Sequence, residues 1–323
     1  MQTNFSLAQL ADPHIAESEK VLRTCVHCGL CTATCPTYLL LGDELDSPRG
    51  RIYLIKDMLE NSKPATTETV KHIDRCLSCL SCMTTCPSGV HYMHLVDHAR
   101  AHIEKTFRRP FADRALRALL AKMLPDRRLF RASLALAGIG KIFRPLLTRL
   151  PVVGIRLSAM VGLAPSRAPA AARRDFPLQG ALRGRVIMLE GCAQPVLAPS
   201  INAAAHFLLA SQGIEVLTIA EEGCCGALTH HMGREAEALA SVRRNIDAWT
   251  RVLEQGPVDA IVVTASGCGT TVKDYGFMLK NDPAYAGKAA AVSALTCDIS
   301  EYVSRLDLQP AVQRQPLTIA YHS

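Results

Sequence analysis

CVHCGLCTATCP, residues 25–36, recurs with the same cysteine spacing as CLSCLSCMTTCP, residues 76–87. In each copy three cysteines follow one another with two residues between them, so a single loop can present three thiolates to one point in space. A fourth cysteine follows after three more residues and stands directly before a proline. We therefore expect the N-terminal part of this 323-residue chain to fold around two cysteine-rich loops.

The spacing is typical of bacterial proteins that bind two [4Fe–4S] clusters, in which the fourth cysteine of each run binds the cluster of the other run. The expected ligands of the first cluster are Cys25, Cys28, Cys31 and Cys86. Those of the second cluster are Cys76, Cys79, Cys82 and Cys35. Structural zinc is the alternative, but it has no need for a four-cysteine run that ends in proline and occurs twice. The sequence therefore favours iron–sulfur clusters.

Cysteine content and composition indicate the class of protein. The chain contains thirteen cysteines and no secretory signal pattern at its start, so we expect metal-bound thiolates in a reducing cytoplasm rather than disulfides. A hydrophobic content of 49% supports well-packed cores, and the length suggests about two domains. No run of eighteen uncharged apolar residues occurs. We expect a cytoplasmic protein, either soluble or peripheral on the cytoplasmic face of the inner membrane.

Positive charge is concentrated in residues 105–174, which contain sixteen Lys or Arg and only two acids, Asp113 and Asp126. This segment carries a net charge of +14, whereas the whole chain carries +7. Aliphatic rather than aromatic residues separate the arginines, so we expect no nucleic acid as a partner. Contact with an anionic membrane surface or a partner subunit is the favoured interpretation, and a plain solvated surface is the alternative.

Helices are predicted around the two loops. Residues 14–24 form a short helical pattern, and Ser47 followed by Pro48 is a typical helix start. Arg49 and Arg51 near this start are expected either to compensate the charge of the clusters or simply to be exposed. A further helix is expected after the second loop, with four histidines on one of its sides. Such a row could bind a metal or haem, but it is more often simply a partly exposed side of a helix. These histidines are His91, His94, His98 and His102.

The pattern changes twice along the rest of the chain. Prolines interrupt short basic helical stretches in residues 110–183, and strands then alternate with helices, which indicates a parallel α/β sheet. The predicted fold class is α+β with several domains: a helical two-cluster ferredoxin-like domain (1–109), a basic helical connector (110–183) and an α/β domain with a mainly parallel sheet (184–310).

Four more cysteines follow the carboxyl ends of the predicted strands, where α/β folds place ligands: Cys192, Cys224, Cys225 and Cys268. The arrangement resembles the CCG (cysteine-rich) domain of the heterodisulfide reductase family, whose members can bind an unusual iron–sulfur cluster. This chain has Thr271 where the family pattern often has a further cysteine. A cluster or zinc on these cysteines, with His230 or His231 as a substitute ligand, and a purely structural role both stay open. Cys297 is expected to be a core residue.

The order of these parts resembles the iron–sulfur subunits of bacterial glycolate oxidase (glycolate dehydrogenase). The resemblance rests on both cysteine runs, SPRGRIYLIK (47–56), LPDRRLF (124–130), RPLL (144–147) and EEGCCGALTHHMG (221–233). In that family a second CCG domain follows the first. LTIAYHS (317–323) is similar to its opening strand, so we expect residues 311–323 to begin an incomplete second CCG domain in a shortened version of the subunit.

The resemblance also implies a function. The chain has no Gly-x-Gly-x-x-Gly motif after a strand, no P-loop and no recognisable flavin-binding segment, so we expect it to carry electrons rather than to accept hydride. Flavoprotein subunits of the same complex would oxidise glycolate to glyoxylate, and a quinone-type acceptor would take the electrons. The alternatives are an electron-transfer subunit of a glycerol-3-phosphate or lactate dehydrogenase, a CCG-type disulfide reductase subunit and a zinc-stabilised interaction module.

Overall fold

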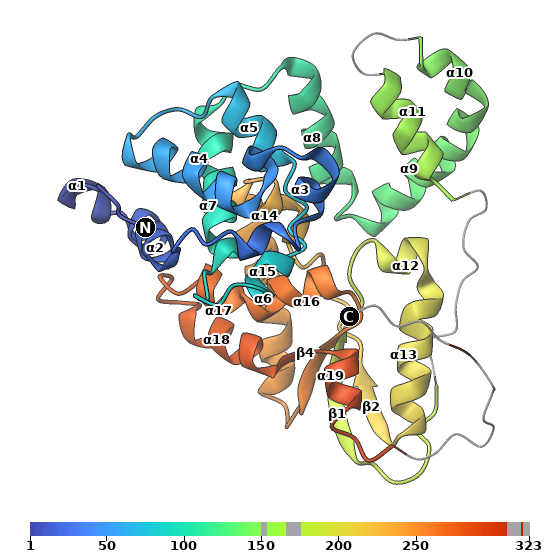
Figure 1. Cartoon of the computed structure of the whole chain (residues 1–323). Coiled ribbons are helices and arrows are strands. Elements are labelled where there is room, and N and C mark those ends of the chain that lie inside the picture. Colours follow the sequence, from blue (N-terminus) through green and yellow to red (C-terminus); the bar gives the residue numbers. More distant parts are fainter. Residues whose placement is uncertain (150–153, 166–175, 309–317, 319–323) are drawn as a thin grey trace. The chain divides into compact units, whose positions relative to one another are not determined.

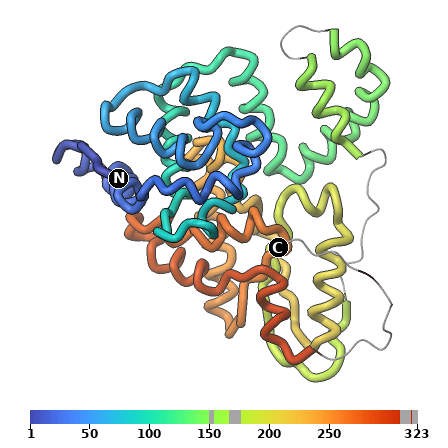
Figure 2. Tube along the Cα trace, viewed as in Figure 1, coloured from blue at the N-terminus to red at the C-terminus, as the bar shows by residue number. Residues whose placement is uncertain are grey.

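The structure is a computed structural model that describes residues 1–149, 154–165, 176–308 and Thr318. The chain forms two compact units (Figures 1 and 2). Unit 1 comprises Met1–Lys122 and Gly226–Ala240, and unit 2 comprises Met123–Cys225 and Ser241–Ser323. The predicted domain limits at residues 109, 183 and 310 rest on sequence patterns and stay predictions. The predicted strand in residues 311–323 lies outside the described residues, apart from Thr318.

Unit 1 consists of helices and loops in the part of it that the structure describes. Figure 2 traces it as the blue-to-teal part of the chain together with a short segment of later sequence. Its helices are α1 (Leu7–Leu10), α2 (Pro13–Thr24), η1 (Leu30–Thr32), α3 (Pro36–Leu41), η2 (Glu44–Asp46), α4 (Pro48–Glu60), α5 (Thr67–Asp74), α6 (Ser81–Thr84), α7 (Tyr92–Thr106), α8 (Phe111–Met123), α14 (Ala227–His231) and the first turns of α15 (Glu235–Leu253).

Local sequence sets the starts of the helices that flank the first loop. Asp12 caps α2 through its side chain, and Pro13 follows at the first helical position. Ser47 accepts a hydrogen bond from Gly50 N at 2.9 Å, and Pro48 begins α4, as the Ser-Pro pair predicts. Cys35 stands at the N-cap of α3, directly before Pro36. The proline after the first cysteine run therefore turns the chain out of the loop and into a helix.

The core of unit 1 lies between α2, α4, α5 and α7. It contains aliphatic side chains that are 0–1% exposed, each of which contributes about 1.5–3 kcal/mol by burial. They are Leu22, Ile55, Leu59, Ile73, Leu95 and Ile103. Cys25, Cys76, Cys82 and Cys86 pack against this core, so the two cysteine loops rest on a rigid helical base.

Unit 2 combines a helical segment with a four-stranded sheet. Its helices are α9 (Arg127–Gly140), η3 (Lys141–Phe143), α10 (Arg144–Leu147), α11 (Gly154–Leu163), α12 (Gln194–Leu197), α13 (Pro199–Ser211), the rest of α15, α16 (Ser266–Lys273), α17 (Tyr275–Met278), α18 (Ala286–Leu295) and α19 (Ile299–Val303). Its strands are β1 (Gly184–Leu189), β2 (Ile214–Leu217), β3 (Ala260–Val263) and β4 (Thr296–Asp298).

The sheet has the order β2-β1-β3-β4 and is parallel throughout. Val186 of β1 is paired with both Val216 and Ala260, so β1 and β3 form the buried centre. Residues of α13 and α19 join one face of the sheet in a common cluster that includes Cys297, which is 3% exposed. The predicted α+β class is thereby confirmed. Cys297 is a core residue, as expected.

Two details of unit 2 differ from the sequence prediction. β4 was not predicted, because three residues carry too short a pattern to reveal a strand. Cys268 was expected in a loop, but it lies in the first turn of α16, since the helix begins at Ser266, three residues after the end of β3.

The segment α9–α11 exposes both apolar and basic side chains. Its exposed large apolar residues are Leu129, Leu136, Ile139, Ile142, Phe143, Leu146, Ile155 and Leu163. Arg128, Arg131, Arg144, Arg149 and Arg156 are also exposed, and the sequence contains no Asp or Glu from residue 127 to residue 174. Within the described ranges, none of the helices has the length and apolar character needed to span a bilayer.

Candidate metal centres

The two cysteine loops adopt the same unusual backbone conformation at matching positions. Gly29 and Leu80, each directly after the second cysteine of its run, have φ angles of +83° and +59°. His27 and Ser78, each directly before that cysteine, have φ angles of +58° and +52°. Left-handed residues of this kind are uncommon outside glycine. Their repetition shows that the sequence repeat is also a structural repeat in which each loop curls around its cysteines.

The two loops lie next to each other although they are far apart in sequence. Thr34 Oγ1 donates a hydrogen bond to the carbonyl oxygen of Ser81 at 3.3 Å. Thr85 Oγ1 in turn donates to Thr34 Oγ1 at 3.3 Å. Thr34 and Thr85 are the residues directly before the fourth cysteine of each run. These contacts bring the end of each run close to the other loop.

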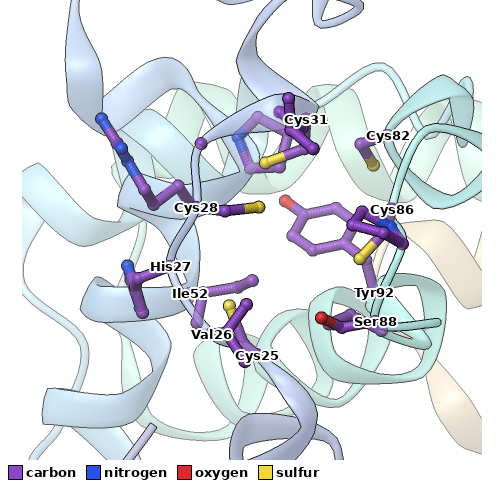
Figure 3. A pocket seen from close by; sticks show the side chains of 16 residues that line it. Cys25, Val26, His27, Cys28, Cys31, Ile52, Cys82, Cys86, Ser88 and Tyr92 are labelled. Atoms are coloured by element: carbon purple, nitrogen blue, oxygen red, sulfur yellow. The ribbon is translucent and has the colours of Figure 1, made fainter.

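The first cavity is lined by the first three cysteines of one run and by the last two cysteines of the other, Cys82 and Cys86 (Figure 3). It has a volume of about 450 Å³, and the sulfur atoms of Cys25, Cys28, Cys31 and Cys86 lie around it. Apolar side chains, Val26, Leu30, Ile52 and Val90, form much of its remaining wall.

The second cavity shows the reciprocal arrangement. It has a volume of about 330 Å³, and its lining includes Cys35, Cys76, Cys79 and Cys82. Tyr92, Pro48 and Cys82 line both cavities, so the two cavities are neighbours. Tyr92 is 3% exposed and donates a hydrogen bond from its hydroxyl to Cys76 Sγ at 3.8 Å.

The spread of the sulfur atoms distinguishes between zinc and a cluster. A tetrahedral zinc ion with Zn–S bonds of about 2.3 Å would hold its sulfurs about 3.8 Å apart. Among the described residues, the ligand atoms of Asp43, Asp46 and His72 form a group within 4.8 Å of one another. No three cysteine sulfurs of the described residues lie this close together, which favours a larger iron–sulfur cluster over a single ion.

Burial has a cost for these thiols in the absence of a cation. Desolvation is the main cause that raises the pKa of Cys82 to about 12, and nearby cysteines add to it. Burial likewise raises the pKa of Cys31. Thiolates that are unfavourable on their own become favourable when they bind iron, because the cation removes the repulsion between them. The donor set therefore suits a cationic iron–sulfur core.

A buried ionic network lies beside the second cavity. Asp46, which is 0% exposed, accepts hydrogen bonds from His72 at 2.9 Å and Arg75 at 2.6 Å, and Arg51 lies 3.5 Å away. Burial would raise the pKa of Asp46, but the hydrogen bonds from His72 and Arg75 outweigh it and hold the pKa below its ordinary value. These four residues form the Asp46 network. Since Arg51 and Arg75 face both carboxylate oxygens, the Asp43–Asp46–His72 group is not a cation site.

Asp97 of α7 is the centre of a second buried group in unit 1. It lies 3.2 Å from His230 Nε2 and 3.1 Å from His231 Nδ1, both in α14. Burial would raise the pKa of Asp97, but hydrogen bonds from these two histidines lower it well below the ordinary value. Arg100, also paired with Asp97, donates to the carbonyl oxygen of Cys76 at 2.8 Å and so holds the second loop. The histidines thus contact Asp97, and the proposal that they substitute for a CCG cysteine finds no support.

His91, at the N-cap of α7, and the three histidines within the helix lie on a partly exposed side, as predicted. His98 contacts Ser18 Oγ through Nδ1 at 2.6 Å, and His102 Nε2 lies 3.1 Å from the carbonyl oxygen of Lys63. Burial, followed by the charges of His14 and His102, lowers the pKa of His98 to about 4. His91 and His94 stack on each other. Because His98 and His102 have different partners, the row does not act as one metal site.

The four CCG cysteines come together at the carboxyl end of the sheet in unit 2. Cys192 follows β1 and donates from Sγ to Cys224 Sγ at 3.5 Å. Cys225 forms side-chain hydrogen bonds with both Cys224 and Cys268. The chain order reverses between β1 and β3, which is where open α/β sheets bind ligands. The predicted set is therefore brought together by the fold, as a row rather than a compact tetrahedron.

Two fully buried side chains hold the backbone of the Cys224-Cys225 segment. Asn245 of α15 donates to the carbonyl oxygen of Cys224 at 3.1 Å and accepts from Gly223 N at 2.8 Å. Tyr275 of α17 donates to the carbonyl oxygen of Cys225 at 2.8 Å. Both side chains are 0% exposed. The segment is thus fixed before any ligand binds.

The protonation of the CCG thiols follows from their mutual contacts. The hydrogen bond with Cys224 and then burial raise the pKa of Cys192 far above its ordinary value. Hydrogen bonds with Cys224 and Cys268 raise the pKa of Cys225, and the bond from Cys225 lowers that of Cys268. No three of these described sulfurs lie within 4.8 Å of one another, which is wider than a single zinc ion requires. Soft thiolate donors suit both zinc and iron–sulfur clusters, and the arrangement of these four in a row favours a cluster with several metal atoms.

Sequence reasoning missed the acidic residues next to this site. Glu190 and Glu222 are each two positions before a CCG cysteine and are 6% and 9% exposed. Arg127 pairs with Glu190 at 3.2 Å and donates to the carbonyl oxygen of Gly191 at 2.8 Å. Burial raises the pKa of Glu222 to about 7. The shared Glu-Gly-Cys order at 190–192 and 222–224 is the signal that could have revealed this pair.

Two family models match the chain. One describes a 4Fe-4S dicluster domain and matches residues 21–90, which contain both cysteine runs. The other describes a cysteine-rich domain (CCG) and matches residues 186–273, which contain the four CCG cysteines. The chain is accordingly an iron–sulfur protein with two [4Fe–4S] clusters in its N-terminal part and a CCG domain after it. No solved structure is significantly similar to the chain.

Three relatives illustrate the similarity. The glycolate oxidase iron-sulfur subunit of Escherichia coli K12 is 45% identical over 322 residues, covering 100% of this chain and 75% of the relative. The probable glycolate oxidase iron-sulfur subunit of Bacillus subtilis 168 is 30% identical over 300 residues, 90% of this chain and 67% of the relative. Lactate utilization protein A of an Exiguobacterium species is 26% identical over 139 residues, 43% of this chain and 55% of the relative. The chain belongs to the family of glycolate oxidase iron–sulfur subunits.

Proposed function

We propose that this electron-transfer subunit receives electrons from flavoprotein subunits that oxidise glycolate to glyoxylate and passes them to a quinone-type acceptor. Oxidation of the alcohol releases two electrons and two protons. A flavin accepts them together, whereas each [4Fe–4S] cluster carries one electron at a time. The observation that carries this proposal is the pair of neighbouring cysteine-lined cavities, which share Cys82 and Tyr92.

The proposed ligands are those expected from the sequence. Cys25, Cys28, Cys31 and Cys86 would bind the first cluster, and Cys76, Cys79, Cys82 and Cys35 the second. The lining of the two cavities supports this crossed assignment, because the last cysteine of each run lies on the cavity of the other run. We refer to these sets as site 1 and site 2.

An assay with two acceptors tests the function. The flavoprotein subunits and this chain are combined anaerobically, and glycolate-dependent reduction of a water-soluble quinone is compared with reduction of a dye that takes electrons directly from the flavin. We expect quinone reduction to require this chain with both clusters and dye reduction to proceed without it. Equal quinone reduction in the absence of the chain would contradict the proposal.

Another donor is the main alternative, since one relative is a lactate utilization protein. The same assay with lactate or glycerol 3-phosphate, each with its own flavoprotein, distinguishes these possibilities. The 45% identity over the whole chain to a glycolate oxidase subunit favours glycolate.

The CCG site is proposed to bind a further iron–sulfur cluster. Replacing Cys225 with serine should then reduce the iron content to that of the two ferredoxin-type sites, about eight iron atoms per chain. A purely structural cysteine would instead cost about 1–3 kcal/mol without a change in metal content. Cys297→Ser is the matched control, because Cys297 is equally buried but lies in the core of the sheet. If metal analysis found the same iron content in Cys225→Ser and Cys297→Ser, a cluster at the CCG site would be excluded.

The segment α9–α11 is proposed to contact an anionic membrane surface. Exposed apolar residues combined with exclusively basic charges are typical of helices that lie on such surfaces. Arg127 should be left intact in a test, since it holds the backbone next to Cys192.

Charge reversal of Arg128 and Arg131 to glutamate should weaken binding to vesicles that contain anionic lipid by at least about tenfold, since each basic residue contributes about 1 kcal/mol. Arg251→Glu with Lys288→Glu is the control with the same change of net charge at exposed positions of other helices. Vesicle sedimentation at moderate salt measures the difference. If both double variants bound the vesicles equally well, the segment α9–α11 would not be the part of the chain that contacts the membrane.

A further inference from the structure

Arg51 is a fully buried arginine whose head group faces site 2. It is 1% exposed, and its NH1 group donates a hydrogen bond to Cys35 Sγ at 3.9 Å. Its other nitrogens donate to the carbonyl oxygen of His72 at 2.7 Å and to Thr37 Oγ1 at 3.1 Å. The planar guanidinium is thus fixed in one orientation, with its NH1 group directed at the sulfur of a proposed ligand.

The positive charge of Arg51 is only partly balanced by its neighbour. Asp46 forms its short contacts with His72 and Arg75, whereas its distance to Arg51 is 3.5 Å. Tyr92 adds a neutral donor to the same site through its 3.8 Å hydrogen bond to Cys76 Sγ. Arg51 and Tyr92 therefore both donate to sulfurs of site 2, and Thr37 Oγ1 also contacts Cys35 Sγ at 3.2 Å.

Site 1 has a different environment. The side-chain donors to sulfur described above belong to site 2, whereas Cys31 of site 1 forms a hydrogen bond with the backbone of Arg49. Arg49, two positions before Arg51 on the same helix, is 34% exposed and pairs with Glu44 at 2.8 Å. Arg49 also lines the first cavity, but its charge is screened by solvent and by that partner. Apolar side chains line much of the remaining wall.

We propose that Arg51 is a positioning residue that raises the reduction potential of site 2 above that of site 1 through Cys35. One-electron reduction adds a negative charge to a cluster, and a buried cation or a hydrogen bond to a ligand sulfur stabilises that added charge. The inference rests on the proposed ligand sets and deepens the proposed function, because it orders the two sites. Electrons would enter at site 1 and move to site 2, from which the acceptor takes them.

A redox titration of the whole chain tests this order. Anaerobically reconstituted protein is reduced stepwise with dithionite, and EPR spectra follow the two clusters separately. Cys86→Ala identifies the signal of site 1 by its loss. In the unmodified chain, site 2 should be reduced first. Arg51→Met should lower the potential of site 2 and leave that of site 1 unchanged.

Three further variants make the test specific. Arg75→Gln removes another cationic partner of Asp46 that is 40% exposed, so solvent screens its charge and the variant should lower the potential of site 2 less than Arg51→Met does. Tyr92→Phe should lower the potential of site 2 without disturbing the Asp46 network, and Arg51→Lys, which keeps the charge, should retain more of that potential than Arg51→Met. If Arg51→Met fails to assemble, Arg51→Lys decides the question: loss of the guanidinium hydrogen bond to Cys35 should lower the potential of site 2 relative to the unmodified chain, and an unchanged potential would overturn the proposal.

The outcomes separate this inference from the proposed function. If both clusters assemble in Arg51→Met and their potentials stay unchanged or shift by the same amount, Arg51 does not have the proposed role. The proposed electron-transfer function would be unaffected by that result. Earlier reduction of site 1 would reverse the proposed order and overturn the inference as well. A chain that binds only one cluster after full reconstitution would instead contradict the ligand sets themselves.

Discussion

Cys86→Ala is expected to remove the cluster of the first loop although Cys86 belongs to the second run. Iron and sulfide should fall from about eight to about four of each per chain from the ferredoxin-type sites. The physical reason is that Cys86 lies on the cavity formed by Cys25, Cys28 and Cys31, which keep only three thiolates without it (Figure 3). Site 2 keeps all four of its cysteines and should retain its EPR signal.

The reciprocal variant is the matched control for this prediction. Cys35→Ala should remove the signal of the second loop and preserve that of the first, because Cys35 lies on the cavity of Cys76, Cys79 and Cys82. The two variants should therefore lose different signals. If Cys86→Ala altered the signal that depends on Cys76 while the signal of Cys25 persisted, the ligands would not cross, and each run would bind its own cluster.

Asp46→Ala should destabilise unit 1 by about 3–5 kcal/mol, the cost of leaving a buried charge without its partner. Arg51 is 1% exposed and would keep its charge in the interior without a carboxylate. His72, also 1% exposed, would lose the acceptor for its Nδ1 group. The expected fall in the midpoint of anaerobic thermal unfolding is roughly 10 °C or more. Circular dichroism and the visible absorbance of the clusters should report it together.

Asp57→Ala is the control for Asp46→Ala. Asp57 pairs with Lys63 at 3.4 Å, but the two side chains are 66% and 53% exposed, so this pair contributes at most about 1 kcal/mol. The contrast isolates burial as the cause of the larger effect. Similar unfolding midpoints for the two variants would show that the Asp46 network does not stabilise the fold.

The cysteine loops and their flanking helices could be predicted because their signals are local. Three cysteines at fixed intervals describe one loop, and Ser47-Pro48 describes one helix start. The alternation of strands and helices likewise predicted a parallel sheet with cysteines at one end, and the order β2-β1-β3-β4 brings those cysteines together. Each of these features depends on residues that are close in sequence or on the general geometry of parallel sheets.

The Asp46 network could not be predicted in the same way, because its members are brought together by tertiary packing. Asp46 and His72 are 26 residues apart and belong to different helices. One signal was available for Arg51: it lies four positions before Ile55 and seven before Met58, on the apolar side of α4. That period predicts a buried side chain for Arg51. It is compatible with an exposed side chain for Arg49.

Tyr92 was missed for a related reason. It directly follows His91, the first histidine of the row, and shows no metal-ligand spacing, yet it lines both cluster cavities. Its position depends on how α7 packs against the two loops. The helix position of Cys268 was also missed. The connection between β3 and α16 is so short that Cys268 already lies in the first turn of the helix.

Reductive titration of the anaerobically reconstituted chain, followed by EPR, tests the central claim of two one-electron sites most directly. The account predicts that the chain takes up at least about two electrons and develops two [4Fe–4S] signals, one dependent on Cys86 and the other on Cys35. Uptake of one electron or none by a fully loaded chain, or zinc in place of iron at the eight ferredoxin-type cysteines, would contradict it.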